Sequence, residues 1–282
     1  MQKMKIFAFA DEASPNIDSQ IKALVRNNLN GLEIRNVDGV NVSDIPLCKA
    51  KEVLKKLSEN SLSVWSVGSP IGKTDILGNF DDDIEHFKHT LDVANALNTK
   101  NMRIFSFYIP KGKNPCDYKN EVIDRLGALS ELAIGSGVTL CHENEKGIYG
   151  DTPERCLDIF KAVPEICGIF DSANFVQCGV DTLRAWDMLG GYIKYLHIKD
   201  SLADGSIVPA GNGVGNIGKI IGMYREHGGD ALTLEPHLAV FDGLSGLERE
   251  GETSNVGKFV FSSNDEAFDA GCYALKKVLE DL

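Results

Sequence analysis

The feature that most constrains the fold is a regular alternation of short apolar runs with longer segments of helical periodicity. β-Branched and aromatic residues dominate the short runs, and the longer segments repeat apolar residues every three or four positions. The expected strands are 5–10, 31–35, 63–67, 102–108, 138–142, 168–171, 195–199 and 231–235, and the expected helices are 16–28, 43–60, 81–97, 118–134, one opening at 152, 181–189, 217–227 and 265–282. Such alternation implies a parallel sheet. Eight units favour a closed (β/α)₈ barrel over an open doubly wound sheet.

Length and composition fit one barrel domain over residues 1–282. The chain has 282 residues, close to the roughly 250 of a barrel with modest insertions. No Pro/Ser/Gly-rich tract separates the units, and 43% hydrophobic with 25% charged residues is the composition of a globular protein. Two connections stand out. The glycine-rich run 211–218 lacks the Lys-Ser/Thr of a phosphate loop, so we expect a flexible turn into the seventh helix. The segment 236–264 is a long loop whose Phe241, Leu244, Leu247 and Val256 predict that it packs on something.

The net charge and the cysteine pattern limit the classes of partner and the cellular compartment that fit this chain. A net charge of −12 argues against a nucleic-acid backbone or an anionic membrane as the main partner. The apolar run after Met1 is broken at Asp11 and Glu12, and no stretch reaches the ~18 apolar residues of a membrane span. The seven cysteines are odd in number and scattered, which is typical of free thiols in a reducing compartment. The sequence therefore predicts a cytoplasmic protein.

Four of the expected strands end in residues of the types that commonly act as metal ligands. Glu143, Asp171, His197 and Glu235 lie at the ends of the last four strands. Because the carboxyl ends of barrel strands open at one mouth, we expect these four residues to converge there. Three carboxylates and one imidazole suit a divalent ion. Their hardness favours Mn²⁺, while Zn²⁺, Mg²⁺ and Co²⁺ remain alternatives.

The segments around these residues resemble a known family. Residues 140–145 (LCHENE), 170–174 (FDSAN), 197–200 (HIKD) and 234–237 (LEPH) are similar to the xylose-isomerase-like barrel superfamily, nearest to its sugar (phosphate) isomerase/epimerase branch. The resemblance implies that the four residues bind the ion and that Glu143 and Glu235 exchange protons with opposite sides of a bound sugar. Family members often carry His three residues after the aspartate, where this chain has Asn174. The resemblance is also compatible with a homo-oligomer.

Further residues near the strand ends are candidates for contacts with substrate. They are Asn174, Lys199, Asp200, Glu33, His237 and Glu145. Asp200 has two other interpretations, since it could orient His197 or form a surface salt bridge. His142 precedes Glu143 and points the opposite way in a strand, so we expect it to face outward or to be packed.

These features predict a metal-dependent isomerase or epimerase. The expected reaction is proton transfer through an enediolate on a small ketose, polyol ketone or hydroxy-keto acid. In a second interpretation both glutamates are pure ligands and a bound water performs the chemistry. The alternative activities are a dehydratase of the inosose or dehydroshikimate type on the same site, an endonuclease-four-like phosphodiesterase, and a non-catalytic sugar-binding barrel.

Overall fold

A computed structural model describes residues 4–244, 256 and 259–282 of the chain. Eight parallel strands form a closed barrel in the order β1-β12-β9-β8-β7-β6-β5-β2, and β1 pairs with β2 to close the ring. The barrel strands are β1 Lys5–Ala8, β2 Gly31–Ile34, β5 Ser63–Val67, β6 Asn101–Ile104, β7 Thr139–Glu143, β8 Cys167–Asp171, β9 Ile193–Ile198 and β12 Ala231–Leu234. The predicted (β/α)₈ barrel is confirmed.

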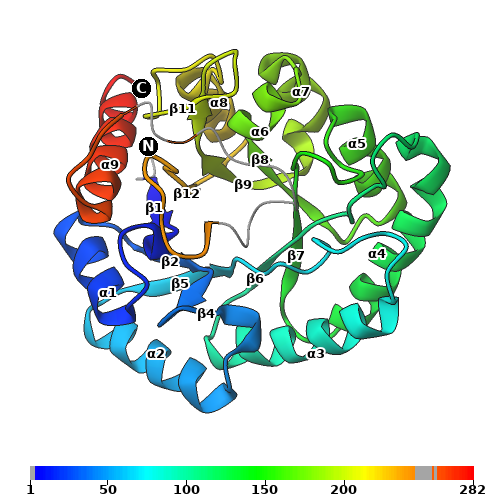
Figure 1. The fold of residues 1–282 in the computed structure, drawn as a ribbon, viewed down its shortest axis with the longest axis horizontal. Coiled ribbons are helices and arrows are strands. Elements are labelled where there is room, and N and C mark those ends of the chain that lie inside the picture. The colour runs from blue at the N-terminus through cyan, green and yellow to red at the C-terminus, as the bar shows by residue number, and fades with distance from the viewer. Residues whose placement is uncertain (1–3, 245–255, 257–258) are drawn as a thin grey trace.

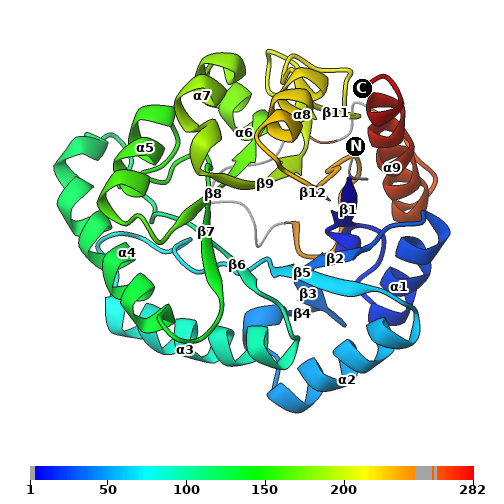
Figure 2. The ribbon, with the colours of Figure 1, turned by 180° about the vertical axis from the view of Figure 1, so that it is seen from behind.

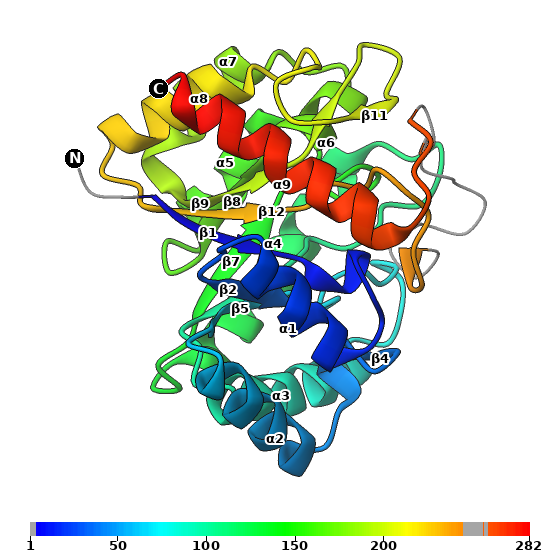
Figure 3. The ribbon, with the colours of Figure 1, turned by 90° about the vertical axis from the view of Figure 1, so that its left-hand side faces the viewer.

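Helices surround the strands, as Figures 1 and 2 show from the two ends of the barrel. They are α1 Ile17–Arg26, α2 Leu47–Glu59, α3 Phe80–Ala96, α4 Lys119–Ala133, α5 Pro153–Ala162, α6 Ser172–Gln177, α7 Thr182–Leu189, α8 Ile217–Glu226 and α9 Asn264–Glu280. Most begin at a polar residue whose side chain accepts backbone N–H groups, as Thr152 does before Pro153 in α5. The last helix, α9, lies beside α1 (Figure 3), where Arg26 pairs with Asp265 and Asp269.

Short elements inside the βα loops were not predicted. They are the hairpin strands β3 Asn36–Val37 and β4 Val40–Asn41, the hairpin strands β10 Asp200–Ser201 and β11 Ile207–Val208, helix α6, and 3-10 turns such as Ala10–Glu12 and Val42–Asp44. Two-residue strands are too short to leave a periodic pattern in the sequence. Strand β6 also ends earlier than predicted, and Phe107 adopts a left-handed φ of 62° in the segment that follows.

Two of the buried apolar clusters among the described residues build the barrel itself. The larger one lies between the strands and the helices, as in other barrels of this architecture. The smaller one fills the barrel interior and consists of Phe7, Cys141, Ile169, Tyr195 and Ala231, with Trp65 and Cys167 against them. On the same strands, the charged side chains lie nearer the carboxyl ends than this interior apolar cluster. The apolar cluster therefore fills the barrel interior below the charged side chains.

The first part of the long loop after β12, through Leu244, packs on the barrel mouth. Phe241 and Leu244 are buried, and the Phe241 ring lies 5.0 Å from the guanidinium of Arg35. This part of the loop prediction is confirmed, and Leu247 lies outside the described residues. Within the described part of the chain, the helices lack the combination of length and apolar character that crossing a membrane requires.

Candidate metal centre

The four predicted ligands come together at the barrel mouth. Glu143 and Asp171 are the last residues of β7 and β8, His197 lies in β9, and Glu235 follows β12 directly. The register pairs Asp171 with His197 on neighbouring strands. One ligand atom from each of the four lies within 4.8 Å of the others, and each residue is at most 3% exposed. The predicted convergence is therefore confirmed.

His197 is the centre of the cluster. Its Nδ1 lies 2.8 Å from Glu143 Oε1 and 3.7 Å from Glu235 Oε2, while its Nε2 lies 3.0 Å from Glu33 Oε2. Burial lowers the pKa of His197, but Glu143 and Glu33 outweigh this and raise the pKa to about 10. A proton on Nδ1 and a divalent ion are alternative ways to satisfy these carboxylates, since a metal ligand must be deprotonated. Glu33 then holds the ring through Nε2–H, as carboxylates behind metal-bound histidines do.

Each glutamate of the cluster is paired with a buried arginine. Arg103 Nη1 lies 3.1 Å from Glu143 Oε2, and Arg35 Nη1 lies 3.0 Å from Glu235 Oε1. The two guanidinium groups also contact the ring of Phe9, at 5.0 and 4.4 Å. Burial raises the pKa of Glu143, but His197 and Arg103 lower it to about 2. Both arginines therefore hold the glutamates ionised and fixed in orientation.

Lys199 lies across the mouth of the cluster. Its Nζ is 3.1 Å from Asp171 Oδ2 and 3.2 Å from Glu235 Oε2. Burial disfavours the charged form of Lys199, but Asp171 and Glu235 reverse this and raise its pKa. The pKa of Glu235 is well below its usual value, because Lys199 and His237 outweigh the effect of burial. The ammonium group thus neutralises part of the carboxylate charge.

The composition of the cluster fits a divalent cation. Oδ1 of Asp171 accepts the N–H of Asn174 at 2.8 Å. Its buried Oδ2 is within ion-pair distance of Lys199 but has no aligned hydrogen-bond partner, and burial raises the pKa of Asp171 to about 6. Among the described residues, six buried carboxylates share this region with three buried arginine and lysine side chains and the imidazole of His197: Asp11, Glu12, Glu33, Glu143, Asp171 and Glu235 with Arg35, Arg103, Lys199 and His197. Buried charges are stable when paired or bound to metal, so the excess of carboxylates favours a cation here.

Two predicted substrate contacts are placed differently by the structure. Glu33 is fully buried beneath His197, and its other oxygen accepts the hydroxyl of Tyr195 at 2.9 Å. The carboxylate of Asp200 accepts the N–H groups of Ser201, Gly211, Gly213 and Gly215 at 2.9–3.0 Å. Glu33 therefore positions His197, and Asp200 fixes the glycine-rich loop. The expected flexible turn is thus held by three hydrogen bonds, from Gly211, Gly213 and Gly215, to one side chain.

The remaining predicted contacts lie in or beside the mouth. Asn174 Nδ2 donates to the carbonyl of Asn144 at 2.9 Å and to Glu143 Oε1 at 3.4 Å. Glu145, one-fifth exposed, pairs with Lys73 at 3.0 Å, and His237 lies 3.1 Å from Glu12.

Sequence reasoning missed Arg35, Arg103, Asp11 and Glu12 as parts of the site. Asp11 binds Arg35 at 2.8 Å. The two-residue period of strands signals Arg35, because it shares a face with Glu33. Carboxylates and histidines at strand ends stand out as potential ligands by residue type, whereas an arginine that pairs with them does not.

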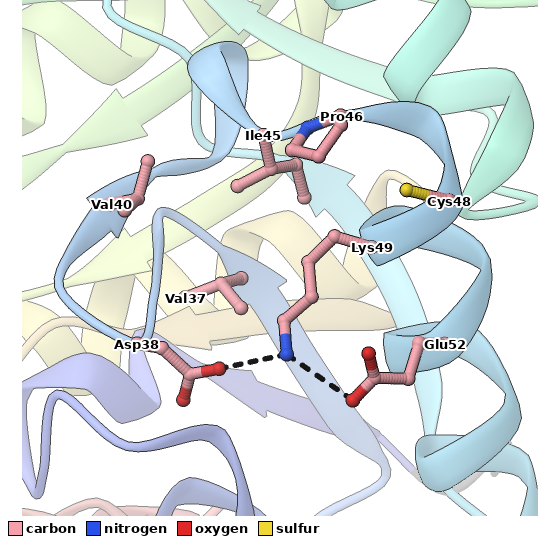
Figure 4. Close-up of a pocket in the computed structure, with 8 residues that line it drawn as sticks. All are labelled: Val37, Asp38, Val40, Ile45, Pro46, Cys48, Lys49 and Glu52. Carbon is pink, nitrogen blue, oxygen red and sulfur yellow. Dashed lines mark hydrogen bonds and ion pairs between the residues drawn. The ribbon is translucent and has the colours of Figure 1, made fainter.

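A separate surface cavity of about 400 Å³ lies between the β3–β4 hairpin and α2 (Figure 4). Its lining is mainly apolar, and Lys49 pairs there with Asp38 and Glu52 at 2.9 and 3.2 Å. The candidate ligands are not part of this lining, so the chemistry-bearing cluster is the one at the barrel mouth.

The fold and the cluster together define a closed (β/α)₈ barrel with, at its mouth, a buried carboxylate–histidine group that could hold a metal ion. The family model described as "Xylose isomerase-like TIM barrel" matches residues 21–251, and the chain belongs to this family. No curated protein matches the sequence significantly.

Solved structures share the fold at low sequence identity. The IOLI protein, solved with a zinc atom, has a TM-score of 0.76 and 16% identity, with 99% of each chain covered. The probable 3-DHS dehydratase AsbF of Bacillus anthracis has a TM-score of 0.73 and 16% identity, covering 98% of this chain and 99% of that one. A D-tagatose 3-epimerase-like protein has a TM-score of 0.71 and 17% identity, covering 99% and 98%.

Proposed function

We propose that the protein is a metal-dependent isomerase or epimerase that moves a proton next to the carbonyl of a small ketose, polyol ketone or hydroxy-keto acid. One observation carries the proposal: two ionised glutamates, Glu143 and Glu235, meet in one buried group of potential metal ligands, and each is held by its own arginine. The family and its structural neighbours, which include proteins named as epimerases and a dehydratase, support the same class of chemistry.

The ion would be held by Glu143, Asp171, His197 and Glu235. When bound there, a divalent ion supplies Lewis-acid stabilisation to the negative oxygens of an enediolate. Mn²⁺ is the proposed ion, because three carboxylates and one imidazole form a hard ligand set. The zinc atom in the neighbouring IOLI structure makes Zn²⁺ the main competitor.

Glu143 and Glu235 perform the proton transfers in this proposal. One ionised carboxylate takes the proton from the carbon beside the carbonyl, and the other takes up a proton from solvent and delivers it to the substrate. Both are ionised at neutral pH, since their pKa values are lowered, so either can act as the acceptor. Arg35 and Arg103 fix the two carboxylates, which limits each to one side of the substrate. Lys199 contributes positive charge beside Glu235 and Asp171.

A dehydratase is the second candidate. Loss of a hydroxyl group next to the abstracted proton needs an acid that protonates the leaving oxygen. The Lys199 ammonium, 3.2 Å from Glu235, would donate a hydrogen bond to the leaving oxygen beside a proposed base, and solvent would supply the proton because the pKa of Lys199 is raised. The fold shared with the probable dehydratase AsbF favours the same candidate.

Incubation of the Mn²⁺-loaded protein with a panel of ketoses and hydroxy-keto acids in D₂O, followed by NMR, tests the proposal. An epimerase or isomerase incorporates deuterium and conserves substrate mass, whereas a dehydratase produces an enone with loss of water. We expect Glu143→Gln and Glu235→Gln to abolish deuterium incorporation. Unaltered exchange in either variant removes that residue from proton transfer, and full activity after removal of all metal contradicts the proposal.

A further inference from the structure

A second group of ligand atoms adjoins the first. Glu12, Glu235 and His237 each offer an atom within 4.8 Å of the others, and all three are buried. Glu12 ends the 3-10 turn that follows β1, and His237 lies two residues beyond Glu235 in the loop after β12. Glu235 is thus a member of both groups.

The second group repeats the geometry of the first. His237 Nδ1 lies 3.1 Å from Glu12 Oε1 and 3.8 Å from Glu235 Oε1. The corresponding distances from His197 Nδ1 are 2.8 Å to Glu143 Oε1 and 3.7 Å to Glu235 Oε2. Ligands bound at roughly 2.1 Å from one ion lie about 3–4 Å apart, which matches both sets. Glu235 offers one oxygen to each group, as a carboxylate that bridges two ions does.

His237 Nδ1 supplies an independent observation. His237 is only 6% exposed, and this nitrogen has no hydrogen-bond partner. It is within ion-pair distance of Glu12, but the atoms are not aligned for a hydrogen bond. Glu12 is itself oriented toward His237, because its Oε2 accepts the His237 backbone N–H at 2.7 Å. A buried imidazole nitrogen aimed at two carboxylate oxygens needs a cation or a proton between them.

The surrounding charge favours a cation. Asp11, Glu12 and Glu235 surround the single guanidinium of Arg35, which contacts Asp11 at 2.8 Å, Glu235 at 3.0 Å and Glu12 at 3.5 Å. An added ion would share Glu12 and Glu235 with Arg35. His237 would turn the lone pair of its Nδ1 toward this ion.

We infer that Glu12, His237 and Oε1 of Glu235 form a second divalent-cation site, so that the barrel mouth holds two ions bridged by Glu235. The inference builds on the first site of the proposed function. Two ions side by side would bind neighbouring oxygens of a polyhydroxy or hydroxy-keto substrate.

Mn²⁺ titration of the chelator-treated chain tests the second site. Mn²⁺ is chosen because it binds thiolates weakly, which keeps the free cysteines Cys48 and Cys116 out of the count. We expect two ions per chain by calorimetry and by equilibrium dialysis. At full loading, electron paramagnetic resonance should show a coupled Mn²⁺ pair instead of isolated ions.

Variants assign the two ions to their sites. His237→Ala should bind one ion per chain with an isolated-ion spectrum, and Glu12→Gln should do the same. His227→Ala is the matched control, because it removes an exposed imidazole outside both groups, and it should keep two ions. Circular dichroism checks that each variant is folded, and the wild-type stoichiometry and spectrum do not depend on any variant.

One ion per saturated wild-type chain, with an isolated-ion spectrum that His237→Ala leaves unchanged, overturns the second site and keeps the first. His237 then pairs with Glu12 without a second ion. Binding of no ion at all overturns both the second site and the proposed function.

Discussion

The outer and inner faces of the barrel wall hold two buried histidines, His142 and His197, in different electrostatic environments. His142 and Glu143 are neighbours in sequence, yet His142 points into the helix layer while Glu143 points into the barrel. His142 contacts Phe160 and Ser106 Oγ, and burial lowers its pKa to about 4. His197, equally buried, has a pKa raised to about 10 by Glu143 and Glu33. The comparison teaches that burial alone does not decide the charge of a histidine, because the paired partners do.

The largest expected effect tests the inner face of β7. Glu143→Gln keeps the shape of the side chain but removes its charge and its ability to take a proton. We expect substrate turnover to fall by about 10²–10⁴-fold, measured as deuterium incorporation from D₂O. Glu145→Gln is the matched control, because Glu145 lies two residues away at the rim and pairs with Lys73. An equal loss in both variants would mean that the inner position has no special role.

His142, on the outer face of β7, should make the stability of the metal-free protein depend on pH. The folded pKa of His142 is about 4, below the ~6.5 of an exposed histidine. The unfolded chain therefore takes up a proton first as the pH falls. The stability contributed by the neutral ring is complete above pH ~6.5 and is lost progressively toward pH ~4, by roughly 3 kcal/mol in total.

Urea unfolding at pH 7 and pH 5 measures this loss. His142→Gln removes the titrating ring, so the variant should lose less stability than the wild type between the two pH values. If the two proteins lose the same amount, His142 is not neutral in the folded state, and the contrast with His197 is broken.

A smaller effect is expected when Glu33, which contacts Nε2 of His197, is replaced. Glu33→Gln still accepts a hydrogen bond from His197 Nε2 but no longer carries a charge. We expect Mn²⁺ affinity to weaken about 10–100-fold, as for other outer partners of metal-bound histidines. Calorimetry measures the affinity, and Ser66→Ala is the control, because Ser66 contacts Tyr195 in the same layer without charge. Unchanged affinity in Glu33→Gln would leave Glu33 with a structural role alone.

The sequence predicted the frame of the site better than its interior. The eight strand–helix units and the four residues Glu143, Asp171, His197 and Glu235 follow from periodicity and from strand ends, which are local signals. Arg35 and Arg103 were missed because their roles depend on pairing between different strands and loops, over separations of 200 and 40 positions in the sequence. Such pairing depends on register, which no single segment of the sequence encodes.

The loop residues show the same limit. Asp200 was expected near substrate because it follows His197 closely, but a short hairpin turns its carboxylate toward Gly211, Gly213 and Gly215. His237 has a left-handed φ of 45°, which a sequence pattern does not predict for a histidine. Its position beside Glu12 therefore became visible only in the folded chain.

The smallest expected effect concerns Asn174, the residue that stands where the resembled family often has histidine. Its amide reaches Glu143 Oε1 at 3.4 Å, which is long for a hydrogen bond, and donates more closely to the Asn144 carbonyl at 2.9 Å. Asn174→Ala should therefore cost turnover about fivefold, the worth of roughly one hydrogen bond, and leave Mn²⁺ affinity unchanged because Arg103 and His197 still hold Glu143. Steady-state kinetics and calorimetry on the same preparation separate the two quantities. A loss of turnover as large as that of Glu143→Gln would show that Asn174 contacts the reacting atoms directly. An uncharged side chain on the inner face of the barrel would then take part in the reaction beside the charged ones.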